Sequence, residues 1–201
     1  MTRFVLASKS PRRRALLGAL GLSFEVVESG MDEFILESPE ETVVSNARMK
    51  RDDVLQNVSA SSVVIAADTV VVDRGTILGK PVDVPEARAM LRRLSGKTHH
   101  VLTGLAVTDT RTGLAVEGFE RTGVTFRTLT CQEIDRFIEA VNPVDRAGAY
   151  TVDGPGSLLV ESYDGCYQNV LGLPVVRLDK LLREIGYSLF DFVHGPDAVF
   201  L

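Results

Sequence analysis

The ten residues 63–72, with the sequence VVIAADTVVV, are the stretch around which the rest of the chain is interpreted. Eight of the ten are apolar, and six are β-branched Val or Ile. Such a run is typical of a strand buried on both faces, because that strand has no need to alternate polar and apolar side chains. It therefore predicts a central strand of a sheet.

Asp68 and Thr69 interrupt this run in its middle. An ionised carboxylate without a partner is very costly in an apolar interior, and it takes up a proton rather than stay charged there. We therefore expect Asp68 to face a polar cleft, a cation or a fixed hydrogen-bond donor, and we expect the remaining segments to supply that cleft.

The composition indicates a soluble globular protein of one domain or two small lobes, with 201 residues, 45% hydrophobic and 24% charged. A net charge of −5 argues against a general nucleic-acid binder but allows a local basic pocket. Cys131 and Cys166 form no CxxC pair and are expected to be reduced and structural. Without a signal peptide or a long apolar stretch, we expect a cytoplasmic protein that does not span a membrane.

Periodicity and turn residues predict an alternation of strands and helices with no internal repeat. The expected strands are 3–7, 24–27, 63–72, 99–109, 114–129 and 157–162, and the expected helices are 11–20, 39–54, 84–94, 131–141 and 175–185.

The segment after the first strand reads Ser8-Lys9-Ser10-Pro11 and precedes a helix, with Ser10 as a candidate N-cap and Pro11 as the first helical residue. A strand, a tight loop and a helix N-terminus together form a typical anion site. Arg12, Arg13 and Arg14 add guanidinium groups in the first turn, where the helix dipole disfavours each cation by about 0.3–1 kcal/mol. A bound polyanion would reverse that penalty, and a solvated basic turn is the alternative.

Other charged residues are ambiguous when each is taken alone. Glu33 could ligate a metal and Lys50 could meet a phosphate, although a solvated surface charge is the commoner role for either. Lys80 lies between Gly79 and Pro81, which would aim its side chain at a defined place. His99 and His100 point to opposite faces of a strand, so they cannot easily hold one zinc ion and are expected to be structural or rim residues.

Taken together, the ordered segments resemble the Maf protein family up to about Gly186. The matching segments are LASKSPRR (6–13), DE (32–33), Lys50, AADTVV (66–71), LGKP (78–81), SGKTHHVLTG (95–104), AGAY with DGPGSLLVE (147–161) and YQNVLGLPV (167–175).

This resemblance implies a nucleoside triphosphate pyrophosphatase that uses a divalent cation such as Mg²⁺, Mn²⁺ or Co²⁺. It implies a two-lobed mixed α/β sheet with flanking helices, similar to the inosine-triphosphate pyrophosphatases, with the active cleft between the lobes. Residues 1–187 would form the domain and 188–201 a C-terminal tail, and a homodimer is expected.

The resemblance also assigns roles to individual residues. Asp68 matches the catalytic acidic residue, either as a base or, with Glu33, as a metal ligand; Ser8, Arg13, Lys50 and Lys80 match phosphate-facing positions. The residue chemistry agrees, because Mg²⁺ prefers one or two carboxylates with phosphate oxygens and water, and because positioning and charge stabilisation dominate phosphoryl transfer.

Three positions bear on the substrate. By resemblance, Arg12 and Thr69 match the Maf class that acts on dTTP and UTP, whereas Asp153 stands where that class has Gln and the 7-methyl-GTP class has Glu. An ionised Asp153 can still accept a hydrogen bond from the ring N3–H of thymine or uracil. The expected function is therefore house-cleaning hydrolysis of dTTP and UTP. The alternatives are 7-methyl-GTP hydrolysis and a non-catalytic nucleotide-binding regulator of septum formation.

Overall fold

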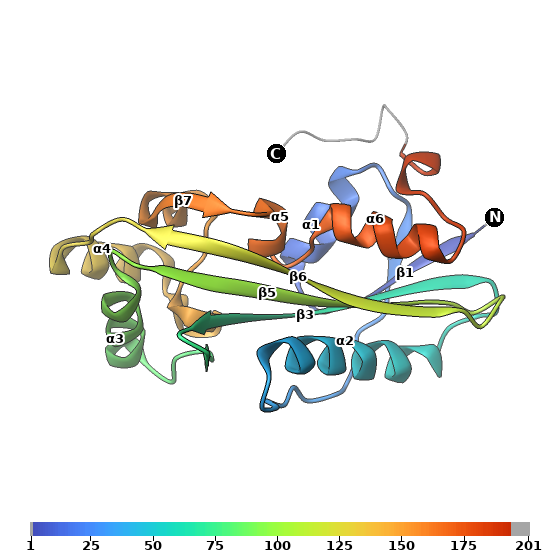
Figure 1. The fold of residues 1–201 in the computed structure, drawn as a ribbon, viewed down its shortest axis with the longest axis horizontal. Helices are drawn as coiled ribbons and strands as arrows, with labels where there is room; N and C mark the ends of the chain where they lie inside the picture. Colours follow the sequence, from blue (N-terminus) through green and yellow to red (C-terminus); the bar gives the residue numbers. More distant parts are fainter. Residues whose placement is uncertain (1, 194–201) are drawn as a thin grey trace.

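The computed structural model describes residues 2–193 (Figure 1). Its strands are β1 Arg3–Ala7, β2 Phe24–Val26, β3 Ser62–Asp73, β4 Thr76–Leu78, β5 Thr98–Asp109, β6 Ala115–Phe126 and β7 Val160–Asp164. Its α-helices are α1 Pro11–Ala19, α2 Pro39–Leu55, α3 Val84–Leu94, α4 Cys131–Val141, α5 Tyr167–Val170 and α6 Val175–Glu184. Short 3₁₀ turns span Pro143–Asp145, Ala147–Ala149, Gly154–Leu159 and Leu189–Asp191.

The strands form one seven-stranded mixed sheet in the order β2-β1-β3-β5-β6-β7, with β4 added to β3. β1 runs parallel to β2 and β3, and the pairings of β3 with β5, β5 with β6 and β6 with β7 are antiparallel. β3, β5 and β6 have twelve residues each and form the long ribbon that runs through the molecule in Figure 1. The expected mixed α/β sheet with flanking helices is confirmed.

β3 is buried on both faces, as its sequence predicts. Ile65 and Ala67 pack against side chains of α1 and α6 on one face, while Val64 and Val70 belong to clusters that include α2 on the other face. Figure 1 shows α2 below the ribbon and α1 and α6 above it. Asp68 lies on the α2 face, because side chains alternate along a strand.

A glycine on β5 allows α2 to approach the sheet closely at this point. Gly104 pairs with Asp68 in the β3–β5 register. A Cβ atom at residue 104 would lie only 2.2 Å from the Val43 carbonyl oxygen of α2. The missing side chain therefore lets the α2 backbone sit against the strand, within reach of Asp68.

The predicted N-terminus of α1 is confirmed. The helix begins at Pro11, and the Ser10 hydroxyl accepts a hydrogen bond from the Arg13 amide. A tight hairpin turn at residues 73–76 joins β3 to β4, and Asp73 pairs with Thr76 across it.

Two predicted segments differ from the structure. The strand expected at 157–162 begins only at Val160, because residues Gly154–Leu159 form a 3₁₀ turn. This turn is too tight for a side chain at Gly156, where a Cβ atom would lie 1.8 Å from the Thr151 carbonyl oxygen. The strand expected at 114–129 is shorter and ends at Phe126.

The first part of the predicted tail packs on the core. Leu189 is buried, and the Phe192 ring meets the Phe4 ring edge-on at a centroid distance of 4.8 Å. The remainder of the predicted tail, residues 194–201, lies outside the described residues. The division into two lobes and the domain boundary at residue 187 stay predictions.

Candidate functional site

The candidate site lies at a gap in the pairing along one edge of β3. β1 pairs with residues 62–66 of β3 and β4 pairs with residues 71–73, while β5 occupies the opposite edge. Residues 67–70 therefore border a cleft between the end of β1 and the end of β4, whose last residue, Leu78, pairs with Val71. The cleft has a volume of about 560 Å³. Because it lies at the strand edge, Asp68 and Thr69 both line it although they point to opposite faces.

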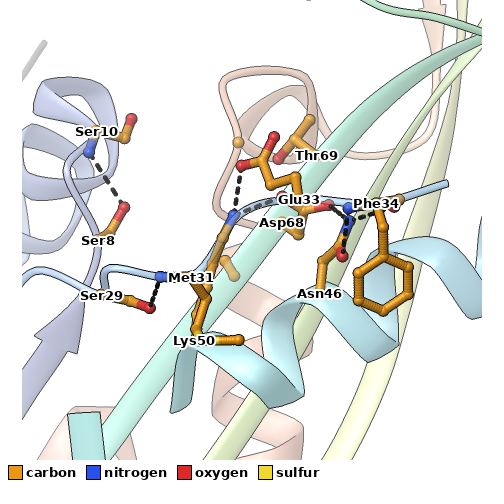
Figure 2. A network of polar contacts seen from close by, with 12 residues as sticks. Ser8, Ser10, Ser29, Met31, Glu33, Phe34, Asn46, Lys50, Asp68 and Thr69 are labelled. Carbon is orange, nitrogen blue, oxygen red and sulfur yellow. Dashed lines mark hydrogen bonds and ion pairs between the residues drawn. The ribbon is translucent and has the colours of Figure 1, made fainter. Parts of the chain in front are cut away.

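The Asp68 carboxylate is buried, with its side chain 3% exposed, and both of its oxygens are hydrogen bonded. Lys50 Nζ lies 2.7 Å from Oδ1, and Asn46 Nδ2 donates to Oδ2 at 3.0 Å. Lys50 and Asn46 are one helical turn apart on α2, so they reach β3 from the same side (Figure 2). The expectation that Asp68 meets a cation and a fixed donor is confirmed.

Glu33 completes this cluster from the segment between β2 and α2. Its Oε1 lies 2.5 Å from Lys50 Nζ, so the ammonium group is held between two carboxylates. The three side chains differ in exposure, from the buried Asp68 to Glu33 at 56% exposed. Glu33 therefore forms the solvent-facing side of the cluster.

Asp68 remains ionised in this setting. Burial raises the pKa of its carboxyl, but the charge and hydrogen bond of Lys50, the hydrogen bond of Asn46 and the charge of Arg13 together lower the pKa below 3.8. A carboxylate whose pKa is lowered from its ordinary value is a poorer acceptor for a proton from water. The electrostatics therefore favour holding a cation or orienting a water molecule over general-base catalysis.

Arg13 crosses from α1 to the edge of β3. It donates to the carbonyl oxygens of Gly172 at 2.8 Å and Ala67 at 2.9 Å, and to the hydroxyls of Thr69 at 2.8 Å and Ser8 at 3.3 Å. Ala67 belongs to the gap in the strand pairing, so the guanidinium satisfies a carbonyl that the edge leaves open. Four of its five N–H donors are engaged within the protein.

Each of the nine residues predicted for the site lines the cleft, namely Ser8, Arg12, Arg13, Glu33, Lys50, Asp68, Thr69, Lys80 and Asp153. Arg12, Lys80 and Asp153 are exposed on its walls. Asp153 accepts a hydrogen bond from the Thr151 hydroxyl, and the Thr69 hydroxyl also bonds Thr103 Oγ1 at 2.9 Å.

The cleft is more cationic than the chain as a whole. Its lining includes the basic residues Lys9, Arg12, Arg13, Lys50, Lys80 and Arg146 and the acidic residues Glu33, Asp68, Asp145 and Asp153. The surplus of positive charge contrasts with the net charge of −5 for the chain. This local basic pocket fits a small polyanion.

The sequence analysis missed two kinds of residue in this site. Asn46 was missed because a single Asn in a helix carries no sequence signal for a buried role; its spacing of four from Lys50 is the one available clue. Arg146 lines the cleft from the segment between α4 and β7, for which no strand or helix was predicted. Lys50 lies near the end of α2 as expected, because the helix predicted at 39–54 is found at Pro39–Leu55.

Neither His99 nor His100 is among the residues that line the cleft. Within residues 2–193, no three or more His, Cys, Asp or Glu side chains are arranged to hold a metal ion by themselves. His99 is buried and contacts the Tyr150 hydroxyl through Nε2 at 2.8 Å, and burial lowers its pKa to about 4. His99 is therefore neutral at pH 7. Its burial and its contact with Tyr150, a residue that lines the cleft, confirm the expected structural role.

Fold and site together define an α/β protein with a cationic cleft at the edge of a central strand, built around a carboxylate pair that shares one lysine. The family model described as Maf-like protein matches residues 3–185. The chain belongs to this family.

Relatives named dTTP/UTP pyrophosphatase match nearly the whole chain. The protein from Caldicellulosiruptor bescii is 44% identical over 195 residues, covering 94% of this chain and 98% of the relative. The protein from Alkaliphilus oremlandii is 46% identical over 187 residues, covering 92% and 96%. The protein from Bacillus pumilus is 44% identical over 192 residues, covering 94% and 100%.

Solved structures with lower similarity also match. One is a nucleoside-triphosphatase or dITP/XTP pyrophosphatase from Mycobacterium abscessus, at 16% identity and a TM-score of 0.40, covering 64% of this chain and 76% of that chain.

Within residues 2–193, no helix combines the length and the apolar character that a membrane crossing requires.

Proposed function

We propose that this protein hydrolyses dTTP and UTP to the nucleoside monophosphate and pyrophosphate. The observation that carries the proposal is the buried, ionised Asp68 that shares Lys50 with Glu33 in a cationic cleft. The names of the family relatives support the same substrates and reaction. A triphosphate supplies the negative charge that the basic lining of the cleft would neutralise.

A divalent cation fits the residues of the cluster. The carboxylates of Asp68 and Glu33 converge on a single cationic nitrogen, so their oxygens already surround one position for positive charge. Two carboxylates leave coordination places for phosphate oxygens and water, which is the arrangement that Mg²⁺ prefers. Asp68 and Glu33 would hold the ion, whether Mg²⁺, Mn²⁺ or Co²⁺, and a bound ion would supply charge neutralisation and a more acidic water.

The remaining roles, phosphate binding, support of the site and orientation of water, would fall to residues of the chain itself. Lys50, Lys80 and Arg12 would bind phosphate oxygens, and displacement of the Lys50 ammonium toward a phosphate would free both carboxylates for the cation. Arg13 would hold the Ser8 loop and the β3 edge in place, since most of its donors are engaged within the protein. Asp68 would orient the attacking water more than it would remove a proton, given the direction of its pKa shift.

Asp153 is the residue proposed to recognise the base. It is exposed on the cleft wall and can accept the N3–H that thymine and uracil share. The Thr69 hydroxyl would act through the Arg13 network, because it already bonds Arg13 and Thr103. This arrangement is compatible with a pyrimidine nucleotide, and the names of the relatives support that choice of base.

A nucleotide panel tests the proposal. We expect kcat/KM for dTTP and UTP to exceed that for 7-methyl-GTP by at least about 10-fold, in line with the names of the relatives that match nearly the whole chain. Chromatography should identify the monophosphate and pyrophosphate as products. Faster hydrolysis of 7-methyl-GTP would overturn the substrate assignment, and binding without turnover of any nucleotide would indicate the regulatory alternative.

A further inference from the structure

Asn46 is a buried neutral side chain that uses both ends of its amide in the candidate site. Its exposed fraction is 2%. Nδ2 donates to Asp68 Oδ2 and to the Phe34 carbonyl oxygen, each at 3.0 Å, and Oδ1 accepts from the Phe34 amide at 3.2 Å. Asn46 therefore joins the central carboxylate to the residue that directly follows Glu33 (Figure 2).

Asn46 belongs to a row of α2 side chains that holds the segment 29–36 along the helix. The Thr42 hydroxyl accepts from the Leu36 amide, Lys50 pairs with Glu33, and Asp53 accepts from the Gly30 amide and the Ser29 hydroxyl. Residues 42, 46, 50 and 53 lie on one side of a helix. The segment thus runs antiparallel to α2 and is attached to it at four points.

The Asn46 contact also decides how the Asp68 carboxylate is oriented. Because Oδ2 is committed to the amide, Oδ1 is the oxygen that faces Lys50 and Glu33. An amide has no charge to lose or exchange, so this contact persists if the Lys50 ammonium moves toward a phosphate. The second carboxylate is fixed through the same amide, since both backbone groups of Phe34 are bonded to it.

We propose that Asn46 is a positioning residue that fixes the two carboxylates of the site relative to each other. It orients Asp68 directly and places Glu33 through the Phe34 backbone. The expected effect of Asn46 on kcat rests on the proposed hydrolysis of dTTP and UTP. The role of Asn46 in holding Asp68 and Phe34 does not depend on the substrate.

Replacement of Asn46 by leucine, a side chain of similar size without polar atoms, tests the inference. We expect Asn46→Leu to lower kcat for dTTP by about 10- to 100-fold, the usual effect of losing a residue that orients a catalytic or metal-binding group. KM and the Kd for an α,β-imido dTTP analogue should change by less than about 3-fold, because the phosphate-facing cations remain. Hydrogen exchange of the Phe34 amide should accelerate by at least about 10-fold.

Thr42→Val is the matched control. Thr42 is also buried on α2 and holds the same segment at Leu36, but it contacts neither Asp68 nor Phe34. Thr42→Val should accelerate exchange of the Leu36 amide, leave that of Phe34 unchanged, and keep kcat within about 2-fold of the wild type. If Asn46→Leu does not fold, Asn46→Ala removes the same amide without adding bulk and carries the same expectations.

The two proposals fail in different ways. A kcat within 2-fold of the wild type for the folded Asn46 variant, or unchanged Phe34 exchange, would overturn the positioning role. An equal loss of kcat in Thr42→Val would also overturn it, because a general loosening of the segment would then explain the effect. A wild-type protein that hydrolyses no nucleotide would instead overturn the proposed function, whatever the exchange of Phe34.

Discussion

Asp68→Asn is expected to lower kcat for dTTP by about 10³-fold or more, while the Kd for a nonhydrolysable dTTP analogue stays within a few-fold of the wild type. The change removes the charge that would hold a cation and orient water but keeps the size of the side chain, and single catalytic groups are typically worth this much. Steady-state kinetics and calorimetric titration with the analogue check the two halves of the result.

Asp73→Asn is the control for this variant. Asp73 lies on the same strand, is also buried and pairs with Arg93 at 2.6 Å, but it does not line the cleft. The control should lose stability without losing more than about 2-fold in kcat. Full activity in Asp68→Asn would remove Asp68 from the reaction, and an equal loss in both variants would point to damage to the strand instead.

Lys50→Met is expected to reduce the free energy of unfolding at pH 7 by about 3 kcal/mol, because removing one partner of a buried ion pair leaves an uncompensated charge. The loss of stability comes from the pair of Lys50 with the buried Asp68. The pair with Glu33 contributes little, because Glu33 is largely exposed. Activity should fall as well, since the variant lacks a phosphate-facing cation. Urea unfolding at several pH values measures the stability effect.

In Lys50→Met, the contribution of Asp68 to the pH dependence of stability should have the opposite sign to that in the wild type. In the wild type the pKa of Asp68 is lowered on folding, so its contribution is present above the unfolded pKa near 3.8 and is lost as the pH falls through the folded value. Burial is already the largest single influence and raises the pKa of Asp68; without Lys50 only Asn46 and Arg13 oppose it, so we expect the pKa to lie above its unfolded value. Protonation of Asp68 would then recover stability as the pH falls through that raised pKa.

Lys80→Met supplies the comparison for stability, because Lys80 lines the same cleft but is exposed. Its free energy of unfolding should stay within about 0.5 kcal/mol of the wild type. A Lys50→Met protein as stable at pH 7 as the wild type would show that Asp68 does not depend on the ammonium to remain buried.

The central strand and its carboxylate could be predicted because their physics is local. A run of β-branched residues specifies a buried strand, and an ionisable residue inside it requires a partner whatever the fold. Ser10 and Pro11 fixed the start of α1 for the same reason, since capping depends on a few consecutive residues.

The residues and elements that the sequence did not predict depend on contacts between distant segments. Asn46 acquires its role because Gly104, on another strand, lets α2 approach β3, and the four-residue spacing from Lys50 within α2 does not reveal that approach. The 3₁₀ turn before β7 replaced an expected strand because Gly156 packs against the Thr151 backbone. The homodimer, the cytoplasmic location and the preferred cation stay predictions.

Hydrolysis of dTTP in ¹⁸O-labelled water is the most direct test of the central claim, that the cleft directs water to the α-phosphorus. Mass spectrometry of the products should find one ¹⁸O atom in dTMP and none in pyrophosphate. Label in the pyrophosphate would place the attack at the β-phosphorus, and labelled orthophosphate with dTDP would place it at the γ-phosphorus; either result would contradict this account.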